Sequence, residues 1–508
     1  MKKIYSILAL ALILTTSACT KDFADINTNK NVPTAVTPDL LISGVIKSAV
    51  NEQVSQAWGT GNLLVQYTAK IQFVNEDRYL WGEKNGIWNN VYGNMRNVEN
   101  VIELASSGTV KQQNYLGVGL ILKSWLYSLA TDAYGDIPYS ESINAKRSSN
   151  YTPKYDAQEQ IYIGLLADLK RANTILGTSS EPIAGDILFN GSVIKWKKFA
   201  NSLRLRLLMR LSKKKDVKAE MQEIIGNSTL NPIMSSNADN AELKYLADVP
   251  ANQWPLYGSR VGSFDEIRVS KTLSDRLNAI SDPRLNVFGR PSQKSVAAGT
   301  PKIEGIPNGL GDVAALNYNS GPQGVSRVGY TYACLVCNDQ GQTPPISNVA
   351  RGIIMNYSEL QFILAEAVEK GLVTSTVSAE TFYNEGIKSN FDYYKEVVPA
   401  AYGINVTPSS GYFTQPAIVY TGTSQQKLEK IAFQKWIALM FTGLEGWYDW
   451  RRTGLPTVVP GPDNLNNNLV PVRFIYPLSE QSLNKVNRDA AVSRQGADDI
   501  NTKMWIIK

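Results

Sequence analysis

Glu445 and Asp449 are the carboxylates whose spacing most resembles that of a catalytic pair. They lie four residues apart and share one helix face if the helix continues past Gly443. Two carboxylates placed in this way could act as the acid and the nucleophile of a glycosidase. Arg451 and Arg452 follow directly, and neighbouring cations indicate ion pairing. A structural role is therefore favoured over catalysis for both carboxylates.

Asp132 and Asp136 form a second acidic pair, on either side of Gly135. Because short acidic side chains hydrogen-bond nearby backbone groups, we expect capping and turn roles for both. The sequence contains no histidine. This excludes Ser-His-Asp and Cys-His relays, histidine-ligated metal sites and histidine general bases.

Cys334 and Cys337 could form a redox pair, half of a zinc site or a disulfide within a short loop. Zinc requires further ligands, and without histidine or another free cysteine only carboxylates could complete the site. A thioredoxin-like pair would open a helix after a strand, whereas residues 338–345 have the composition of a loop. A local structural disulfide is favoured for an exported protein, and we expect no metal and no cofactor.

Aromatic residues in three predicted loops indicate carbohydrate binding. Flat rings pack against the C–H faces of sugars, while Arg and Asn side chains hydrogen-bond the hydroxyl groups. If residues 75–81 are extended, Tyr79 and Trp81 point to one side and form a stacking platform beside Arg78. The alternative is that these rings only pack the loops onto the scaffold. In order of preference, the candidate ligand-binding residues are Arg78, Tyr79 and Trp81, then Trp254 and Tyr257, then Tyr330 and Tyr332.

The elements that must position these residues are mainly helices. Apolar residues recur at three- and four-residue steps in seven segments, and two starts carry a capping pattern, Asp156 with Glu159 and Ser358 with Gln361. Residues 251–350 contain 11 Gly and 8 Pro, so we expect loops and short strands there. The fold class is mostly α, with helix pairs of the tetratricopeptide kind around a loop-rich region, although no repeat consensus is legible. The predicted helices cover residues 87–106, 115–133, 156–176, 196–211, 358–370, 379–394 and 424–441.

The N-terminus has the pattern of a bacterial lipoprotein signal. Lys2 and Lys3 precede an apolar stretch at residues 4–14 that is too short to span a bilayer. Small residues then lead to Cys19. Its thiol would take a diacylglyceryl group while cleavage frees its amine, and the lipid would anchor the protein to a membrane. The alternative is an ordinary signal peptide cleaved near Ala18.

These observations predict a signal peptide at residues 1–18, a polar tether at 19–37 and a single domain at 38–508. Within that domain we expect a helical scaffold over about 38–226 and 356–508 and a loop-rich insert over about 227–355. The net charge is only +6, and the nine basic residues between 195 and 215 would spread over the polar faces of a helix. We therefore expect no nucleic-acid partner.

Several sequence blocks together resemble the SusD/RagB family of nutrient-binding outer-membrane lipoproteins. The resemblance begins at Cys19-Thr-Lys-Asp-Phe and Asp25-Ile-Asn-Thr-Asn and extends over nearly the whole chain. Cys334 and Cys337 fall outside these blocks. The further blocks are residues 130–139 (ATDAYGDIPY), 195–204 (KWKKFANSLR), 282–285 (DPRL), 443–454 (GLEGWYDWRRTG) and 501–505 (NTKMW).

The resemblance implies four tetratricopeptide-like helix pairs that carry an irregular ligand-binding region. It further implies a lipid-anchored protein of the outer membrane, exposed at the cell surface, that performs no reaction. Such a protein captures a glycan or another oligomeric nutrient and passes it to a SusC-like TonB-dependent transporter. SusD-like proteins also place binding residues at a chain position similar to 75–81. Two alternatives are a peptide-binding member of the same family and a lipid-anchored glycosidase.

Overall fold

Helices form most of the chain, and three two-stranded antiparallel ribbons lie between them. The computed structural model describes residues 36–107, 112–337 and 344–508, so Cys19 lies outside the described residues. The helices are α3 Pro38–Gln56, α4 Asn62–Leu64, α5 Gly86–Ser107, α6 Gln113–Tyr134, α7 Ala145–Ser148, α8 Gln158–Ile175, α9 Val193–Leu211, α10 Lys218–Ile225, α11 Val261–Asp265, α12 Lys271–Ala279, α13 Leu285–Phe288, α14 Gln293–Ala297, α15 Asp312–Asn317, α16 Tyr357–Glu369, α17 Ala379–Val397, α18 Ser424–Ala438, α19 Glu445–Thr453, α20 Leu478–Leu483 and α21 Lys485–Gln495. The strands are β1 Thr68–Lys70, β2 Ile137–Pro138, β3 Tyr155–Asp156, β4 Ala241–Lys244, β5 Ile267–Val269 and β6 Arg351–Met355, and they pair as β1–β5, β2–β3 and β4–β6. Single helical turns are η1 Ala57–Gly61, η2 Asn237–Asp239, η3 Pro250–Asn252, η4 Tyr318–Gln323, η5 Tyr330–Tyr332, η6 Ala400–Tyr402, η7 Tyr412–Thr414 and η8 Trp505–Ile507.

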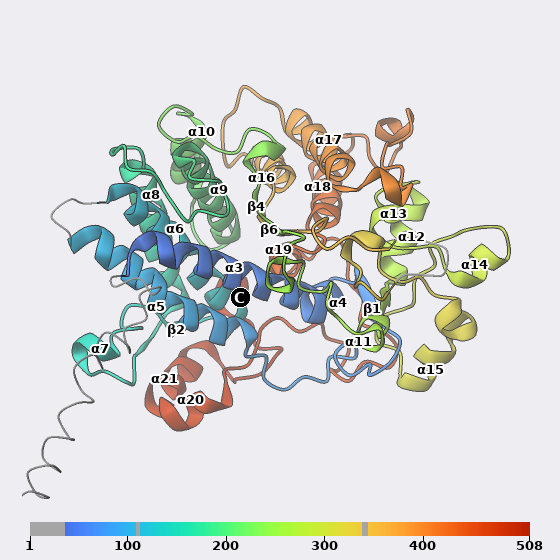
Figure 1. Ribbon diagram of the computed structural model, residues 1–508, viewed down its shortest axis with the longest axis horizontal. Helices are drawn as coiled ribbons and strands as arrows, with labels where there is room; N and C mark the ends of the chain where they lie inside the picture. Colours follow the sequence, from blue (N-terminus) through green and yellow to red (C-terminus); the bar gives the residue numbers. More distant parts are fainter. Residues whose placement is uncertain (1–35, 108–111, 338–343) are drawn as a thin grey trace, which may run out of the picture.

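Most of the long helices pack on the long helix that comes before or after them in the chain. Helix α5 packs on α3 and α6, α6 packs on α8, α8 packs on α9, and α16 packs on both α17 and α18. In Figure 1 helices α5, α6, α8 and α9 lie in the left half of the molecule, while the short helices α12 to α15 lie at the right end. The mostly helical, tetratricopeptide-like fold expected from the sequence is confirmed.

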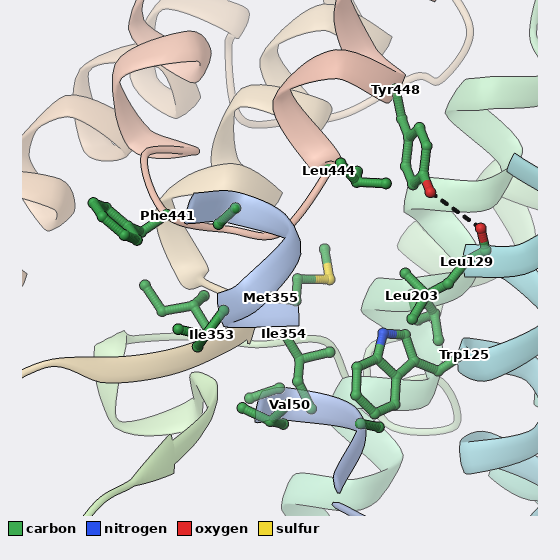
Figure 2. Packing of buried hydrophobic residues seen from close by; sticks show 14 of the residues in the cluster. Val50, Trp125, Leu129, Leu203, Ile353, Ile354, Met355, Phe441, Leu444 and Tyr448 are labelled. Carbon is green, nitrogen blue, oxygen red and sulfur yellow. Dashed lines mark hydrogen bonds between the residues drawn. The ribbon is translucent and has the colours of Figure 1, made fainter. Parts of the chain in front are cut away.

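The core forms where α3, β6 and α6 meet. Helix α6 is buried on almost every side, because helices pack on both of its faces. Figure 2 shows Val50 of α3, Ile354 of β6 and Trp125 of α6 in one apolar cluster. Burial of this cluster supplies the main stabilising term of the fold.

The last third of the chain returns to the helices formed first. The Tyr448 hydroxyl of α19 donates to the Leu129 carbonyl of α6 at 3.0 Å, which is the hydrogen bond drawn in Figure 2. The Phe474 amide donates to the Ala133 carbonyl at 2.8 Å. The Ile506 amide donates to Oε1 of Gln158 at 3.0 Å. Segments more than 300 residues apart thus complete one core.

The predicted long helices are present, but their predicted capping residues are wrong. Helix α8 begins at Gln158, and Asp156 instead accepts hydrogen bonds from the Ser140 amide and hydroxyl at 2.7 and 2.9 Å. Helix α16 is capped by Asn356, whose side chain accepts from the Glu359 amide at 2.7 Å, and not by Ser358. At α8 the N-cap is Ala157, and the Gln158 amide instead donates to the distant Asp136. At α16 another of the polar residues before the helix takes the capping position.

Residues 251–350 contain no long helix within the described part of the chain, as expected. Short helices, α11 to α15, fill this region more than strands do. Ribbon β4–β6 joins the ends of the region to the scaffold, with Leu243 opposite Gly352. None of the helices in the described ranges is both long and apolar enough to cross a membrane.

Candidate ligand-binding surface

The structure brings together two of the three predicted aromatic loops, residues 253–257 and 330–332. The Trp254 indole donates to the Tyr332 carbonyl at 3.3 Å, and the two ring centroids lie 6.2 Å apart. Both rings are buried, with 2% and 4% of their surface exposed, so neither offers a face to a ligand. Their neighbours Tyr257 and Tyr330 are half-buried. Each loop therefore contributes one ring to packing and one to the surface.

The side chain of Arg290 packs against the Tyr330 ring. Its guanidinium carbon lies 4.4 Å from the centroid of the Tyr330 ring, a cation–π contact. The same buried guanidinium donates to the carbonyls of Val328 at 2.8 Å and Cys337 at 2.6 Å. One side chain thus connects the ring to the backbone on both sides of it.

A disulfide joins Cys334 to Cys337, in agreement with the favoured interpretation of this pair. Between the two cysteines, the Leu335 amide donates to the Tyr257 carbonyl at 2.9 Å, while the Leu335 and Val336 side chains are exposed. The disulfide turn therefore holds the first aromatic loop against the second. No group of three or more His, Cys, Asp or Glu side chains suited to a metal occurs in the described ranges.

Tyr402 completes this surface, and sequence reasoning missed it. Its ring centroid lies 5.8 Å from that of Tyr330, and its hydroxyl accepts from the Ile346 amide at 2.8 Å. Burial raises the pKa of Tyr402, and the nearby Tyr257 raises it further. Tyr402 follows Pro399 in a loop, the same signal that identified the other rings, but it lies outside the Gly- and Pro-rich region. Tyr257, Tyr330 and Tyr402 are called the tyrosine surface below.

The first-choice loop, residues 75–81, does not form the extended platform that was expected. The Arg78 and Leu80 amides donate back to the Val74 and Asn75 carbonyls, at 3.0 and 2.9 Å, so this stretch is a series of turns. Tyr79 has a positive φ of 61° and only 2% exposure. A ring so deeply buried cannot stack on a surface ligand.

Trp81 and Arg78 keep part of their surface exposed, and their role in ligand binding stays a prediction. The Trp81 ring lies edge-on to Tyr79 at 6.1 Å and to Phe474 at 5.9 Å. Its indole donates to the Glu76 carbonyl at 2.9 Å. Nε of Arg78 donates to the Asp463 carbonyl at 2.7 Å. These contacts connect the loop to a different part of the molecule from the tyrosine surface.

Asp77 anchors the same loop from inside. Its carboxylate accepts from Nδ2 of Asn308 at 2.7 Å and from the amides of Lys70 and Gly309 at 3.1 and 3.0 Å. Burial raises the pKa of Asp77 to about 6, although these donors act in the opposite direction. The carboxylate stabilises a turn and does not face a ligand.

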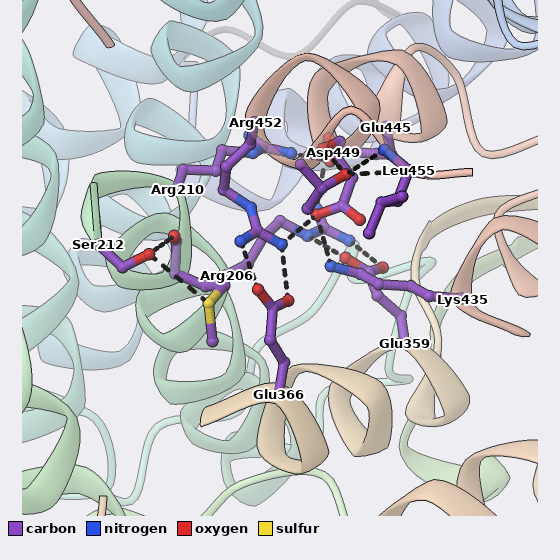
Figure 3. A network of polar contacts seen from close by, with 12 residues as sticks. Arg206, Arg210, Ser212, Glu359, Glu366, Lys435, Glu445, Asp449, Arg452 and Leu455 are labelled. Carbon is purple, nitrogen blue, oxygen red and sulfur yellow. Dashed lines mark hydrogen bonds and ion pairs between the residues drawn. The ribbon is translucent and has the colours of Figure 1, made fainter. Parts of the chain in front are cut away.

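Glu445 and Asp449, the carboxylates with glycosidase-like spacing, lie in a buried ion-pair network (Figure 3). Glu445 pairs with Arg206, at 3.5 Å, and with Arg210. Asp449 pairs with Lys435 and Arg452, both at 2.8 Å. Burial would raise the pKa of Asp449, but these two cations hold it below its ordinary value. The favoured structural interpretation agrees with this arrangement.

Three more carboxylates and the basic helix α9 take part in buried pairs. Arg206 donates to both oxygens of Glu359, at 2.7 and 2.6 Å, and Arg452 donates to both oxygens of Glu366, each at 2.6 Å. The arginines of α9 are therefore core residues and not a solvated face. Asp132 pairs with Arg210 in the core, so its expected capping role is wrong.

Asp136 has the expected turn role. Its carboxylate accepts from the Gln158 amide at the start of α8, at 2.9 Å, and pairs with Arg494 at 2.9 Å. The two acidic residues beside Gly135 thus differ because only Asp132 points into the helical core.

Comparisons with known proteins agree with this fold. Residues 30–477 match the SusD-like family described as starch-binding and associating with the outer membrane. A SusD homologue from Bacteroides fragilis is 27% identical, with a TM-score of 0.79 over 93% of this chain and 100% of that one. A chitin-binding protein is also 27% identical, with a TM-score of 0.77 over the same shares. A chitin-binding SusD homologue from Flavobacterium johnsoniae is 24% identical, with a TM-score of 0.75 over 92% of this chain and 98% of that one. No curated protein sequence matches the chain significantly.

Proposed function

Because the chain belongs to the SusD-like family of outer-membrane-associated binding proteins, we propose that it captures a glycan at the cell surface and passes it to a SusC-like TonB-dependent transporter. The tyrosine surface is the observation that carries this proposal. Tyr257 and Tyr330 are half-buried, the Tyr330 ring contacts the buried Arg290 guanidinium, and the Tyr257 carbonyl accepts from the Leu335 amide. Rings restrained in this way bind the C–H faces of sugars with little loss of side-chain entropy. Arg260, exposed three residues after Tyr257, adds a planar donor for hydroxyl groups.

Binding without catalysis is part of the proposal. The carboxylates Glu445 and Asp449 are each neutralised by two cations inside the core, and a general acid requires access to its substrate. The sequence supplies no histidine as an alternative base. A lipid anchor on Cys19 would hold this binding protein at the outer membrane, beside its transporter.

Calorimetry with maltoheptaose and chitohexaose tests the proposal, since starch and chitin are the polymers named for the family and for two similar structures. Tyr257→Ala and Tyr330→Ala should each weaken binding of the better ligand about 5- to 150-fold, the effect of losing about 1–3 kcal/mol of ring stacking. Tyr151→Ala is the matched control, because that ring is 77% exposed and lies on another loop. Equal affinity in all four proteins would place the site elsewhere, and shortened oligosaccharides after incubation would contradict binding without catalysis.

A further inference from the structure

A cavity of about 750 Å³ lies apart from the residues of the tyrosine surface. It is enclosed by α3, the loop at residues 186–190, the segment 237–246 that contains β4, and α17. Its volume is within the range of small-molecule sites in proteins.

Glu242 is the most unusual group in the wall of this cavity. Only 9% of the residue is exposed, and its Oε2 atom makes no hydrogen bond with any part of the chain that the structure describes. Burial raises the pKa of Glu242, although the charges of Arg351 and Lys244 oppose this effect. Oε2 itself is closed off from the cavity, so a ligand would have to donate to the other oxygen, Oε1. A hydrogen bond donated there would stabilise the charged form of the carboxylate.

The charges around the cavity are balanced in sign. Lys47, Lys195 and Lys244 line it together with Asp186, Glu242 and Glu396. Asp186 is already satisfied, since it accepts from three amides and from the Trp196 indole. An anionic ligand would face Glu242, and a cationic ligand would face three lysines. A neutral ligand therefore fits best.

The remaining polar wall groups favour hydroxyl groups on that ligand. Asn190 lines the cavity, and an amide side chain both donates and accepts. The Nδ2 atoms of Asn237 and Asn252 already donate, to the Ser389 carbonyl at 2.8 Å and to Asp248 at 3.1 Å. A hydroxyl group can donate to the Glu242 carboxylate and accept from an amide or an ammonium. Apolar walls at Leu188 and Phe189 match the C–H faces of a sugar ring.

We propose that this cavity is a second carbohydrate site, which binds a short neutral oligosaccharide through a hydroxyl group donated to Glu242. Its lining contains none of the three rings of the tyrosine surface, although Asn252 in its wall directly precedes the loop that carries Tyr257. The protein would then bind a glycan at two places along its length or hold a cleaved fragment apart from the polymer.

Gly44 allows the cavity to be closed without disturbing the core. It lies in the cavity wall on α3, and a Cβ built at this position meets no atom within 4 Å. Gly44→Phe should therefore fill the cavity, and replacing a helical glycine should also favour α3. Gly93 on α5 is the matched control, because its Cβ position is equally open and it does not line the cavity.

The experiment measures binding of maltotriose and chitotriose by calorimetry in the Tyr257→Ala protein, where the tyrosine surface is weakened. At least one of the two sugars should still bind. That binding should be lost when Gly44→Phe is added to the Tyr257→Ala protein. In the same background, Glu242→Gln should weaken it about tenfold, and Gly93→Phe should leave it unchanged. Thermal midpoints of the variants establish that each of them is folded.

Two results would overturn the second site. If Tyr257→Ala abolishes binding of both sugars, only the tyrosine surface binds glycan, and the proposed function stands without the cavity. If Gly44→Phe binds the sugars as tightly as Gly93→Phe, the residual binding lies outside the cavity. If the single variant Gly44→Phe, which keeps Tyr257, loses binding of both sugars, the cavity is the main site.

Discussion

Trp81 lies edge-on to Tyr79 and Phe474 and donates its indole proton to the Glu76 carbonyl. All three contacts are internal, so this residue works mainly as the support of its own loop. Trp81, Tyr257 and Tyr330 are all half-buried, so exposure alone does not separate a proposed ligand ring from a packing ring.

We predict that Trp81→Ala destabilises the protein by about 3 kcal/mol, because a large partly buried ring is lost. Trp81→Phe keeps the ring contacts but loses the hydrogen bond to Glu76, and should cost only about 1 kcal/mol. Urea unfolding measures both values. An alanine variant with unchanged stability and weakened glycan binding would assign the loop to the ligand.

The burial and the pairing of individual residues could not be predicted from the sequence. The half-buried rings Tyr257 and Tyr330 were found because Pro and Gly surround them, but their neighbours Trp254 and Tyr332 carry the same signal and are buried. The pairing of Arg206 with Glu359 joins residues 153 positions apart, and no local pattern encodes it. Tertiary packing determines both which rings are buried and which charged residues pair.

Helices α9, α16 and α19 are held together by charges as well as by apolar contacts. Arg452 of α19 meets Glu366 of α16 through two hydrogen bonds of 2.6 Å in the core. Breaking a buried pair by removing one partner leaves the other charge without compensation. The network therefore fixes which helix faces meet, and it accounts for the burial of Arg206 and Arg210 on α9.

We predict that Glu366→Gln lowers the free energy of unfolding at pH 7 by about 3 kcal/mol. Arg452 overcomes the effect of burial and lowers the pKa of Glu366 to about 2, below its ordinary value. The stability contributed by this group is therefore complete above about pH 5 and is lost as the pH falls towards 2. The difference between wild type and variant should shrink over the same interval.

Urea titrations at pH 7, 5 and 3 measure this effect. Glu429→Gln is the control, since Glu429 is exposed on α18 and contacts only Gln425 in the same helix. A difference between wild type and Glu366→Gln that is independent of pH would mean that Glu366 has the same pKa in the folded and the unfolded chain, which would contradict its pairing with Arg452.

At the scale of whole elements, the sequence was a good guide. Periodic apolar positions predicted α5, α6 and α9 to within a few residues, because each of these helices buries a continuous stripe. The short helices α11 to α15 were not predicted, since segments of four to nine residues contain too few positions to display a period.

The protein is expected to be anchored to a membrane by lipid on Cys19. We predict that Cys19→Ala remains an unlipidated precursor, because only a cysteine thiol can take the diacylglyceryl group. Cell fractionation and labelled palmitate test this prediction. A variant that still sediments with membranes and still incorporates the label would refute the lipoprotein assignment.

We also predict that the wild-type protein co-purifies from mild detergent with an outer-membrane TonB-dependent transporter. A binding protein held by lipid cannot move solute across a membrane, so it needs such a partner. Recovery of the protein without any transporter of this class, from cells grown on the glycan that it binds, would contradict the proposed hand-off.

The return of the last segments to the first helices also has a kinetic consequence. The Tyr448 hydroxyl and the Leu129 carbonyl that it contacts are separated by 319 residues, and closing so long a loop is slow compared with forming a helix pair. Until α19 arrives, α6 has a bare apolar side that other chains can bind. Refolding yield should therefore fall as protein concentration rises, and a chain interrupted before residue 445 should aggregate instead of forming a stable half.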